Sequence, residues 1–482
     1  MSNSPASSNA SLRYDVAIIG AGFSGSMLAV HLAQSDKRPS VALIEQSRSY
    51  GPGLAYGAAS AEHLLNVPAG KMSAFPELPD HFLNWATQNP EVTFSLGISS
   101  INPGSFLPRL VYGKYLKELI ADASKKTDRL HLIDAEAIDI EPLPDGGSQI
   151  RFADGGSLQA NDVVLAWGNF PPTAPRNTEE EPVTGFLHNP WSQGVRETLA
   201  KAEPILILGS GLTCLDLLAT AKQIGRRGAV HVLSRHGRFP QKHKPAPAYK
   251  AFLKRDALPH TIRNLFRLVR REINKAAYED INWRAVIDSL RPFTQDLWRG
   301  FDDAERRRFL RHVKSLWETI RHRAAPAMVA AKEYLDEHHQ LIRHRGRLEN
   351  IAKNDQGVSV TFRPYGSTES QTLHVQAVIN ATGPESDPQR IQSALLTNLI
   401  SRGMVKPDAL GLGIGITNEQ DPLHTVGSLR KGTLWESTAV PELRVQAVEL
   451  ARLLLQKRTL QAEKPVSSNV LTPPFHHWLF EI

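Results

Sequence analysis

The sequence predicts an α/β fold with two strand-helix-strand units, each followed by a β-meander, and a helical insertion in the second half. Three observations predict it. An apolar strand, a glycine-rich turn and a helix follow one another at residues 14–33, and the same order returns at 204–221. Three alternating apolar runs with glycine-containing turns then follow each unit, at 130–168 and 346–383. The length of 482 residues accommodates two such domains and the insertion.

The first unit has the complete spacing of a dinucleotide-binding turn. Glycines at these positions let the backbone approach a pyrophosphate, and the free N–H groups at the helix N-terminus bind it. The second strand ends in an acid that accepts hydrogen bonds from ribose hydroxyls, and its negative charge disfavours a 2′-phosphate. The candidate contacts of this unit are Gly20, Gly22, Ser24, Gly25 and Glu45.

The second unit has a different strand end, which predicts a different nucleotide. A serine and an arginine stand where the first unit has its acid, and a guanidinium binds a 2′-phosphate through charge-assisted hydrogen bonds. The unit therefore favours NADPH over NADH. Its third glycine is replaced by Cys214, which we interpret as a small packed side chain. The candidate contacts are Gly209, Gly211, Leu212, Thr213 and Arg235. Together the two units predict two Rossmann-like dinucleotide-binding domains.

Composition excludes several kinds of site. A single cysteine rules out internal disulfides, a redox-active cysteine pair and cysteine-rich metal centres, and no His or carboxylate spacing predicts a metal. No apolar run is long enough for a membrane-spanning helix, and the first twelve residues lack the features of a signal peptide. We therefore expect a cytoplasmic protein. The sequence identifies no catalytic side chain.

The positive charge is concentrated in one segment. The formal net charge is +7, but residues 226–275 contain 14 Lys and Arg and two acids, so that this segment carries +12 and the remainder −5. Because the segment includes Arg235, it favours a phosphorylated cofactor over nucleic acid. A solvated helix face, an anionic substrate and an acidic protein partner are the alternatives.

Further blocks extend the comparison beyond the two units. With the strand that ends in Ala381-Thr382-Gly383, the chain resembles the flavoproteins with two dinucleotide-binding domains. Within them it is similar to the bacterial FAD-NAD(P)-binding protein family, related to the flavin-dependent monooxygenases. The blocks that carry this resemblance are Gly51 to Gly57, His63 to Ala69 with Met72-Ser73, Arg109 to Gly113, and Leu434 to Arg444.

The resemblance implies that the first unit holds FAD and the second NADPH. It makes Asn66, Gly427, Ala439 and Val440 candidate flavin neighbours. The helix that begins near Pro441 would direct its dipole at the flavin. Related flavoproteins end the preceding strand in Gly-Asp, whereas this chain has Gly427 followed by serine. The segment Gly185 to Trp191 partly matches a His-containing linker of flavin monooxygenases, and we interpret it as a packed linker.

The expected domains follow from the order of the units. The leader is 1–13, the FAD-binding domain 14–185 with 384–465, the NAD(P)H-binding domain 186–244 with 335–383, the helical insertion and candidate substrate lid 245–334, and the tail 466–482.

These observations lead to an expected activity. We expect an FAD-dependent NADPH oxidoreductase, and because the chain has no dithiol, its reduced flavin would have to pass electrons to O2 or to an external acceptor. We expect a monooxygenase that hydroxylates a small substrate, with an anionic, purine-type molecule as one example. The alternatives are a reductase that serves a quinone or an electron-acceptor protein, and a non-enzymatic redox sensor. The oligomeric state is not predicted.

Overall fold

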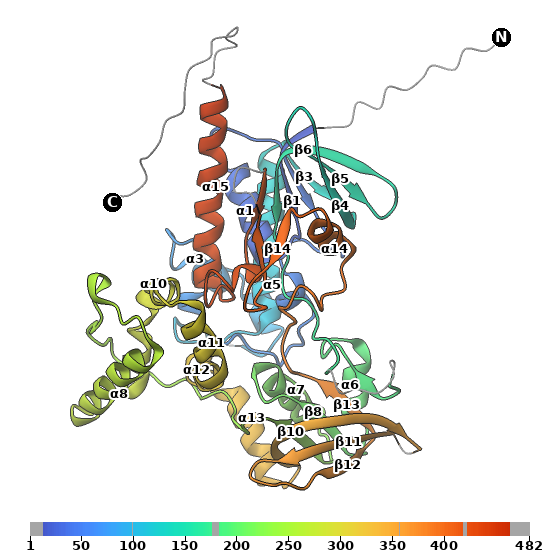
Figure 1. Cartoon of the computed structure of the whole chain (residues 1–482), viewed down its shortest axis with the longest axis vertical. Helices are drawn as coiled ribbons and strands as arrows, with labels where there is room; N and C mark the ends of the chain where they lie inside the picture. Colours follow the sequence, from blue (N-terminus) through green and yellow to red (C-terminus); the bar gives the residue numbers. More distant parts are fainter. Residues whose placement is uncertain (1–12, 99, 176–182, 356, 418–421, 463–482) are drawn as a thin grey trace, which may run out of the picture.

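A computed structural model describes residues 13–98, 100–175, 183–355, 357–417 and 422–462. Two seven-stranded sheets form the two ends of the molecule, and a group of short helices lies beside them (Figure 1). The predicted α/β architecture with two Rossmann-like units is confirmed.

The first sheet has the strand order β3-β2-β1-β6-β5-β4, and β16 pairs with the end of β6. Strands β1, β2, β3, β6 and β16 run parallel, whereas β4, β5 and β6 form the antiparallel meander. The first run of the expected meander contains two strands: β4 belongs to the meander as predicted, whereas β3 follows a crossover helix and extends the parallel sheet beyond β2. The bounds are β1 Arg13–Ile19, β2 Val41–Ile44, β3 Leu130–Ile133, β4 Ala137–Pro142, β5 Ser148–Phe152, β6 Ser157–Leu165 and β16 Leu423–Thr425.

Alternate side chains of this sheet enter two different cores. Val16 and Ile18 of β1 pack against helices α1, α5 and α15, while Ala17 and Ile19 face the meander and α14. The sheet is therefore covered on both faces, as its apolar strands require. The helices here are α1 Phe23–Ala33, α2 Gly53–Gly57, α3 His81–Gln88, α4 Pro90–Phe94, α5 Arg109–Lys126, α14 Ala394–Ser401 and α15 Val440–Ala462, and the pair β14 Val405–Pro407 and β15 Ile414–Ile416 lies nearby.

The second sheet repeats the plan in the order β12-β11-β10-β9-β8-β13-β7. The long strand β10 runs parallel to β9 over its first residues and antiparallel to β11 over the rest. One strand thus serves both the nucleotide unit and the meander. The bounds are β7 Phe186–Leu187, β8 Ile205–Leu208, β9 Val230–Ser234, β10 Leu341–Asn354, β11 Gly357–Pro364, β12 Gln371–Val375 and β13 Ala377–Asn380, with helices α6 Gln193–Ala200 and α7 Leu212–Gln223.

The insertion forms a helical lobe with its own apolar core. Trp298 of this lobe stacks on Trp435, with ring centroids 4.7 Å apart, and its Nε1 donates to the carbonyl of Gly432 at 2.7 Å. The lobe is therefore docked on the segment that precedes α15. Its helices are α8 Ile262–Tyr278, α9 Trp283–Asp288, α10 Thr294–Gly300, α11 Asp303–His312 and α12 Lys314–Arg321.

The expected insertion, 245–334, extends too far at its C-terminal side. Helix α13, Pro326–Glu337, packs against α7 through Met328, Ala331 and Leu335 and belongs to the core of the second sheet. Its Pro at the first position and its apolar spacing look the same as those of an insertion helix, so only the packing partner assigns it.

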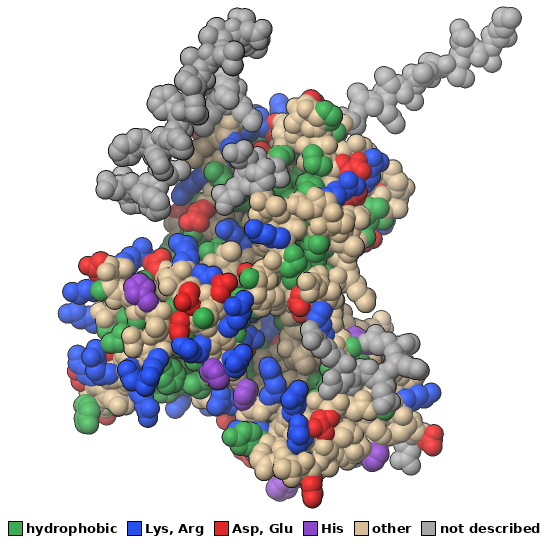
Figure 2. Space-filling model, in the orientation of Figure 1, with side chains coloured by type: hydrophobic (Ala, Val, Ile, Leu, Met, Phe, Trp, Pro, Cys, Tyr) green, Lys and Arg blue, Asp and Glu red, His purple; other side chains and the backbone are tan. Residues whose placement is uncertain are grey.

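Lys and Arg side chains gather over the helical lobe (Figure 2). The cations of α8 are exposed, including Arg263, Arg267 and Arg270. This part of the +12 segment is a solvated helix face, as one of the sequence alternatives described it.

Candidate functional site

The first glycine of each nucleotide turn lies against the end of a neighbouring strand. Gly20 has φ +101°, and a Cβ built on it would lie 2.7 Å from the carbonyl oxygen of Ala166. Gly209 has φ +100°, and its Cβ would lie 2.3 Å from the carbonyl oxygen of Ala381. Only glycine fits both positions, because a side chain would meet a backbone carbonyl in a left-handed conformation. Ala381 belongs to the Ala381-Thr382-Gly383 strand end noted in the sequence, and Ala166 occupies the equivalent position in the first domain, so each of these alanines packs against a nucleotide turn.

The N-termini of α1 and α7 are open to a ligand. Gly22 and Gly211 occupy the N-cap positions, and no side chain in the described parts of the chain caps either helix. The first N–H groups of both helices and their positive dipole ends are thus available for a pyrophosphate. Gly25 allows α1 to approach its own turn, because a Cβ there would lie within 1.9 Å of the carbonyl oxygen of Gly20.

Glu45 lies at the end of β2, next to the first turn. Its Oε2 accepts a hydrogen bond from the N–H of Ala21 at 2.8 Å, and its Oε1 accepts one from Ser47 at 3.0 Å. The carboxylate is therefore oriented at the nucleotide turn. Each oxygen retains a further lone pair, so the ribose contact remains chemically available.

The segment after β16 lies beside the first turn and fits a bound flavin nucleotide. Gly427 has φ +98°, and a Cβ on it would lie 3.2 Å from Oγ of Ser24. The hydroxyl of Ser428 is buried and has no hydrogen-bond partner among the residues that the structure describes. A buried hydroxyl without a partner is costly, and a ligand oxygen would satisfy it. Ser428 follows Gly427 at the position where related flavoproteins have aspartate, so its hydroxyl is a candidate for a contact with the cofactor.

The other candidate flavin neighbours are placed less directly. Val440 starts α15, and its side chain is buried in the core with α1. Ala439 precedes it, and the carbonyl of Asn66 is bound by Nε2 of His243 at 2.9 Å. Any contact from Val440 to a cofactor must come from its backbone, because its side chain is used in packing.

The candidate NADPH contacts meet in one cavity of about 690 Å³. All five of them line it: Gly209, Gly211, Leu212, Thr213 and Arg235. None of the nine candidate FAD contacts does, although the cavity reaches Ser428 and Thr438, which directly follow Gly427 and directly precede Ala439 along the chain.

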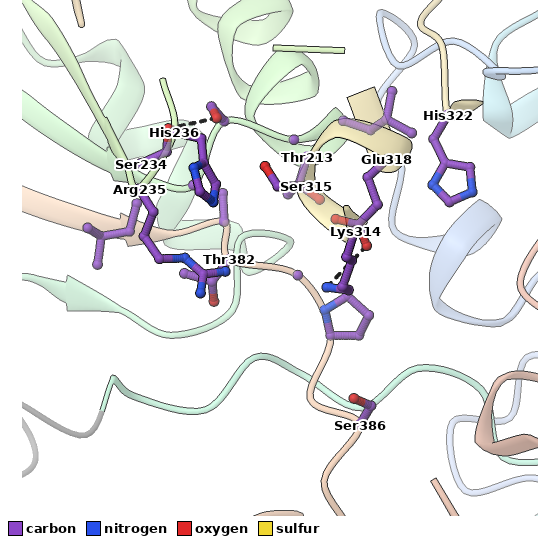
Figure 3. A pocket seen from close by; sticks show the side chains of 18 of the residues that line it. Thr213, Ser234, Arg235, His236, Lys314, Ser315, Glu318, His322, Thr382 and Ser386 are labelled. Atoms are coloured by element: carbon purple, nitrogen blue, oxygen red, sulfur yellow. Dashed lines mark hydrogen bonds and ion pairs between the residues drawn. The ribbon is translucent and has the colours of Figure 1, made fainter. Parts of the chain in front are cut away.

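Arg235 presents an exposed guanidinium to this cavity (Figure 3). It forms no ion pair with another described residue. Burial, with Arg238 and Arg235 nearby, lowers the pKa of His236, so this neighbour is neutral at pH 7. An unpaired arginine at a strand end can therefore take a phosphate without breaking an internal contact.

The sequence analysis missed the residues that α12 contributes to the cavity. Lys314 and Glu318 of α12 and His322, which directly follows the helix, line the cavity at intervals of four residues (Figure 3). Nζ of Lys314 forms an ion pair with Glu318 at 3.1 Å. Their i, i+4, i+8 spacing was a signal, but it looks the same as an exposed helix face until the helix is docked. Lys431 also lines the cavity and forms no ion pair with any residue in the described parts of the chain.

Cys214 is fully buried in the core of the second domain, as its interpretation as a packed side chain requires. Burial raises the pKa of its thiol. Among the described residues, no group of three or more His, Cys, Asp or Glu side chains is placed to hold a metal ion. No helix in the same residues is long and apolar enough to cross a membrane.

Residues 17–170 match the model of a family described as FAD-NAD(P)-binding. The chain has the fold of the flavoproteins with two dinucleotide-binding domains. The FAD-NAD(P)-binding match contains the first nucleotide turn and Glu45, in agreement with the FAD expected there.

Solved structures with this flavoprotein fold cover nearly the whole chain. The ornithine hydroxylase of Pseudomonas aeruginosa has a TM-score of 0.63 at 17% identity, covering 92% of this chain and 99% of its own. The L-lysine 6-monooxygenase of Pseudomonas syringae has 0.62 at 17% identity, with the same coverage. The ornithine N-hydroxylase of Kutzneria sp. 744, solved with reduced FAD, NADP⁺ and L-ornithine, has 0.62 at 14%, covering 93% and 100%.

A curated relative is the uncharacterized protein YdhS of Escherichia coli K12. It is 23% identical over 220 residues, which are 44% of this chain. The match spans only 40% of the length of that relative.

Proposed function

We propose that this protein is an FAD-dependent monooxygenase that uses NADPH and O2 to hydroxylate a small substrate. The observation that carries the proposal is the cavity. It joins the second nucleotide turn, the segment after β16 beside the first turn, and a helix of the insertion. The likeness of the fold to that of hydroxylases, over 92–93% of this chain, supports the same proposal.

The side chains have distinct tasks in this proposal. The N-terminus of α1 and Glu45 hold FAD, while the N-terminus of α7 holds the NADPH pyrophosphate and Arg235 its 2′-phosphate. When bound, FAD supplies the redox chemistry, which is hydride acceptance from NADPH and activation of O2. The protein aligns the two cofactors and excludes water from the cavity, and α12, which covers the cavity, serves to exclude the water.

The substrate is proposed to carry a charged group. Lys314, Glu318 and Lys431 line the cavity, so both charge signs are available for recognition. The similar structures are hydroxylases of ornithine and lysine, which supports a small amino compound. They do not support the purine-type example considered from the sequence.

The decisive experiment is a coupled assay. The purified protein is expected to be yellow, to bleach with NADPH without oxygen, and to form hydroxylated product when oxygen and a substrate are added. Ornithine, lysine, cadaverine and urate are tested with product detection and a peroxide assay. NADPH oxidation that is accelerated by a quinone, with no oxygenated product from any compound, would instead establish the reductase alternative.

A further inference from the structure

A set of buried polar contacts joins the two nucleotide-binding domains. On the first side are the loop at 62–66 and the start of α5, and on the second side is α7. We call the side chains His63, Arg109, Asp216 and Thr220 the interdomain latch. Two of the sequence blocks that carry the family resemblance begin with members of this set, His63 and Arg109, and neither of these two side chains is among the candidate cofactor contacts.

The first contact of the latch is an ion pair. The guanidinium of Arg109 lies 2.8 Å from Oδ2 of Asp216, and the two side chains are 15% and 3% exposed. Nε of Arg109 also donates to the carbonyl of Leu64 at 3.2 Å. Truncating one partner of such a buried pair would leave an uncompensated charge, so the pair resists separation of the domains.

The second contact is a chain of hydrogen bonds with defined donors. The N–H of Ser60 donates to Nδ1 of His63 at 3.1 Å, so the proton of the neutral ring is on Nε2. Nε2 lies 2.9 Å from Oγ1 of Thr220, which in turn donates to Oε1 of Glu62 at 2.9 Å. Burial and the charge of Arg109 lower the pKa of His63 to about 4, which keeps the ring neutral at pH 7.

The linker between the domains packs on the same contacts. The rings of Trp191 and His63 meet edge-on, with their centroids 5.5 Å apart. The guanidinium carbon of Arg109 lies 5.7 Å from the centroid of the Trp191 ring. Arg196 of α6 adds an ion pair to Glu62 at 2.8 Å. The segment Gly185 to Trp191 noted in the sequence therefore packs against the interdomain latch through the side chain of Trp191.

The position of the latch on α7 links it to the cofactor site. Helix α7 begins at Leu212, which lines the cavity, and Asp216 and Thr220 lie one and two turns further along the same rigid helix. On the other side, α5 packs against α1, the helix of the first nucleotide turn. The latch therefore connects the two helices whose N-termini face the two nucleotides.

We propose that the latch residues are positioning residues that hold the NADPH-binding domain in the orientation needed for hydride transfer to FAD. This inference rests on the proposed function. In the step itself, the C4–H bond of NADPH breaks and its hydrogen leaves with two electrons to the flavin, so NADPH is oxidised and FAD reduced. None of the four latch residues lines the cavity, so the latch is proposed to act through α5 and α7. An error of about 1 Å in such an alignment lowers a rate by up to about 100-fold.

The test is rapid-mixing reduction of the oxygen-free holoenzyme by NADPH. Asp216→Asn and Thr220→Val are expected to lower the limiting reduction rate at saturating NADPH by at least about tenfold. They should change the dissociation constant for NADPH by less than about threefold and retain FAD. Asp139→Asn is the matched control, because Asp139 is a buried carboxylate paired with Arg402 within the first domain. It should leave the limiting rate unchanged even where it lowers the melting temperature.

Three outcomes would overturn the inference. The first is an unchanged limiting rate in both latch variants, and the second is an equal loss of rate in Asp139→Asn. The third is a loss explained entirely by weaker NADPH binding or by released FAD. If Asp216→Asn does not fold, Thr220→Val and Thr220→Ser decide, since the serine retains the hydroxyl and should restore the rate. A wild-type protein that NADPH never reduces would refute the proposed function instead.

Discussion

Gly20 and Gly209 occupy equivalent positions in the two halves of the chain. Both follow the first strand of a nucleotide unit, have φ near +100°, and lie against the carbonyl of an alanine that ends another parallel strand. Backbone cannot move aside as a flexible side chain can, so the two turns are closed to any Cβ. The internal repeat is therefore visible in atomic contacts as well as in sequence order.

This relationship predicts that a substitution in one turn abolishes binding of one nucleotide and leaves binding of the other intact. Gly20→Ala should yield protein without FAD, whereas Gly209→Ala should retain FAD but lose NADPH-dependent reduction. Absorbance near 450 nm and NADPH titration measure the two effects. Gly155→Ala is the control, because Gly155 has φ +88° but open space around it. Equal FAD loss in all three variants would point to general backbone strain.

The second prediction concerns the phosphate of NADPH. Arg235→Ala should raise the KM for NADPH by about 10- to 100-fold, as expected for loss of a hydrogen-bonded charge pair of about 1.5–3 kcal/mol. The KM for NADH should change little. Arg343→Ala on the adjacent strand β10 is the control, since its guanidinium pairs with Asp336. Equal effects on both nucleotides would remove Arg235 from the 2′-phosphate site.

A third prediction follows from the burial of Asp216. Burial raises its pKa to about 6, although the Arg109 guanidinium opposes the shift. The folded state thus binds more protons than the unfolded state between the usual pKa near 3.8 and about 6. The contribution of this group to the free energy of unfolding therefore falls as pH rises through that window.

The ion pair with Arg109 has the opposite dependence, since it needs the ionised carboxylate. The limiting rate of flavin reduction should fall as pH is lowered through about 6, and Asp216→Asn should lack this transition. His63, with a pKa of about 4, stays neutral over the range. Burial opposes ionisation of Glu62, but a backbone hydrogen bond and the hydrogen bonds from Thr220 and Arg196 lower its pKa, so it stays ionised. A transition that persists unchanged in Asp216→Asn would assign it to another group.

The fourth prediction concerns the docking of the helical lobe. Trp298 is buried against Trp435, so Trp298→Ala should cost about 3–5 kcal/mol of packing and loosen the lobe over the cavity. We expect faster proteolysis within 245–322 and a larger share of NADPH converted to peroxide rather than product. Tyr278→Ala is the control, because that ring is 93% exposed. A Trp298→Ala variant that resists proteolysis and converts NADPH to product without extra peroxide would show that docking of the lobe does not depend on this contact.

Local chemistry made much of the fold predictable. The glycine spacings, Glu45 and Arg235 lie in turns whose geometry follows from a few consecutive residues, and the structure places them at strand ends as expected. The boundary of the insertion was wrong at α13, and β3 was assigned to the wrong part of the sheet. Both errors concern which neighbour an ordinary amphipathic or apolar segment packs against, and local spacing does not contain that information.

By itself, the sequence determined that this chain has two dinucleotide units with different charges at their strand ends, and that it has no cysteine pair for redox chemistry. The tertiary structure alone decided that Lys314, Glu318 and Lys431 share the cavity with Arg235, and that Arg109 finds Asp216 across the domains. The physical reason is the distance along the chain over which the interactions act. Turns and caps are set by neighbours along the chain, whereas a cavity and a buried ion pair depend on how separate helices dock.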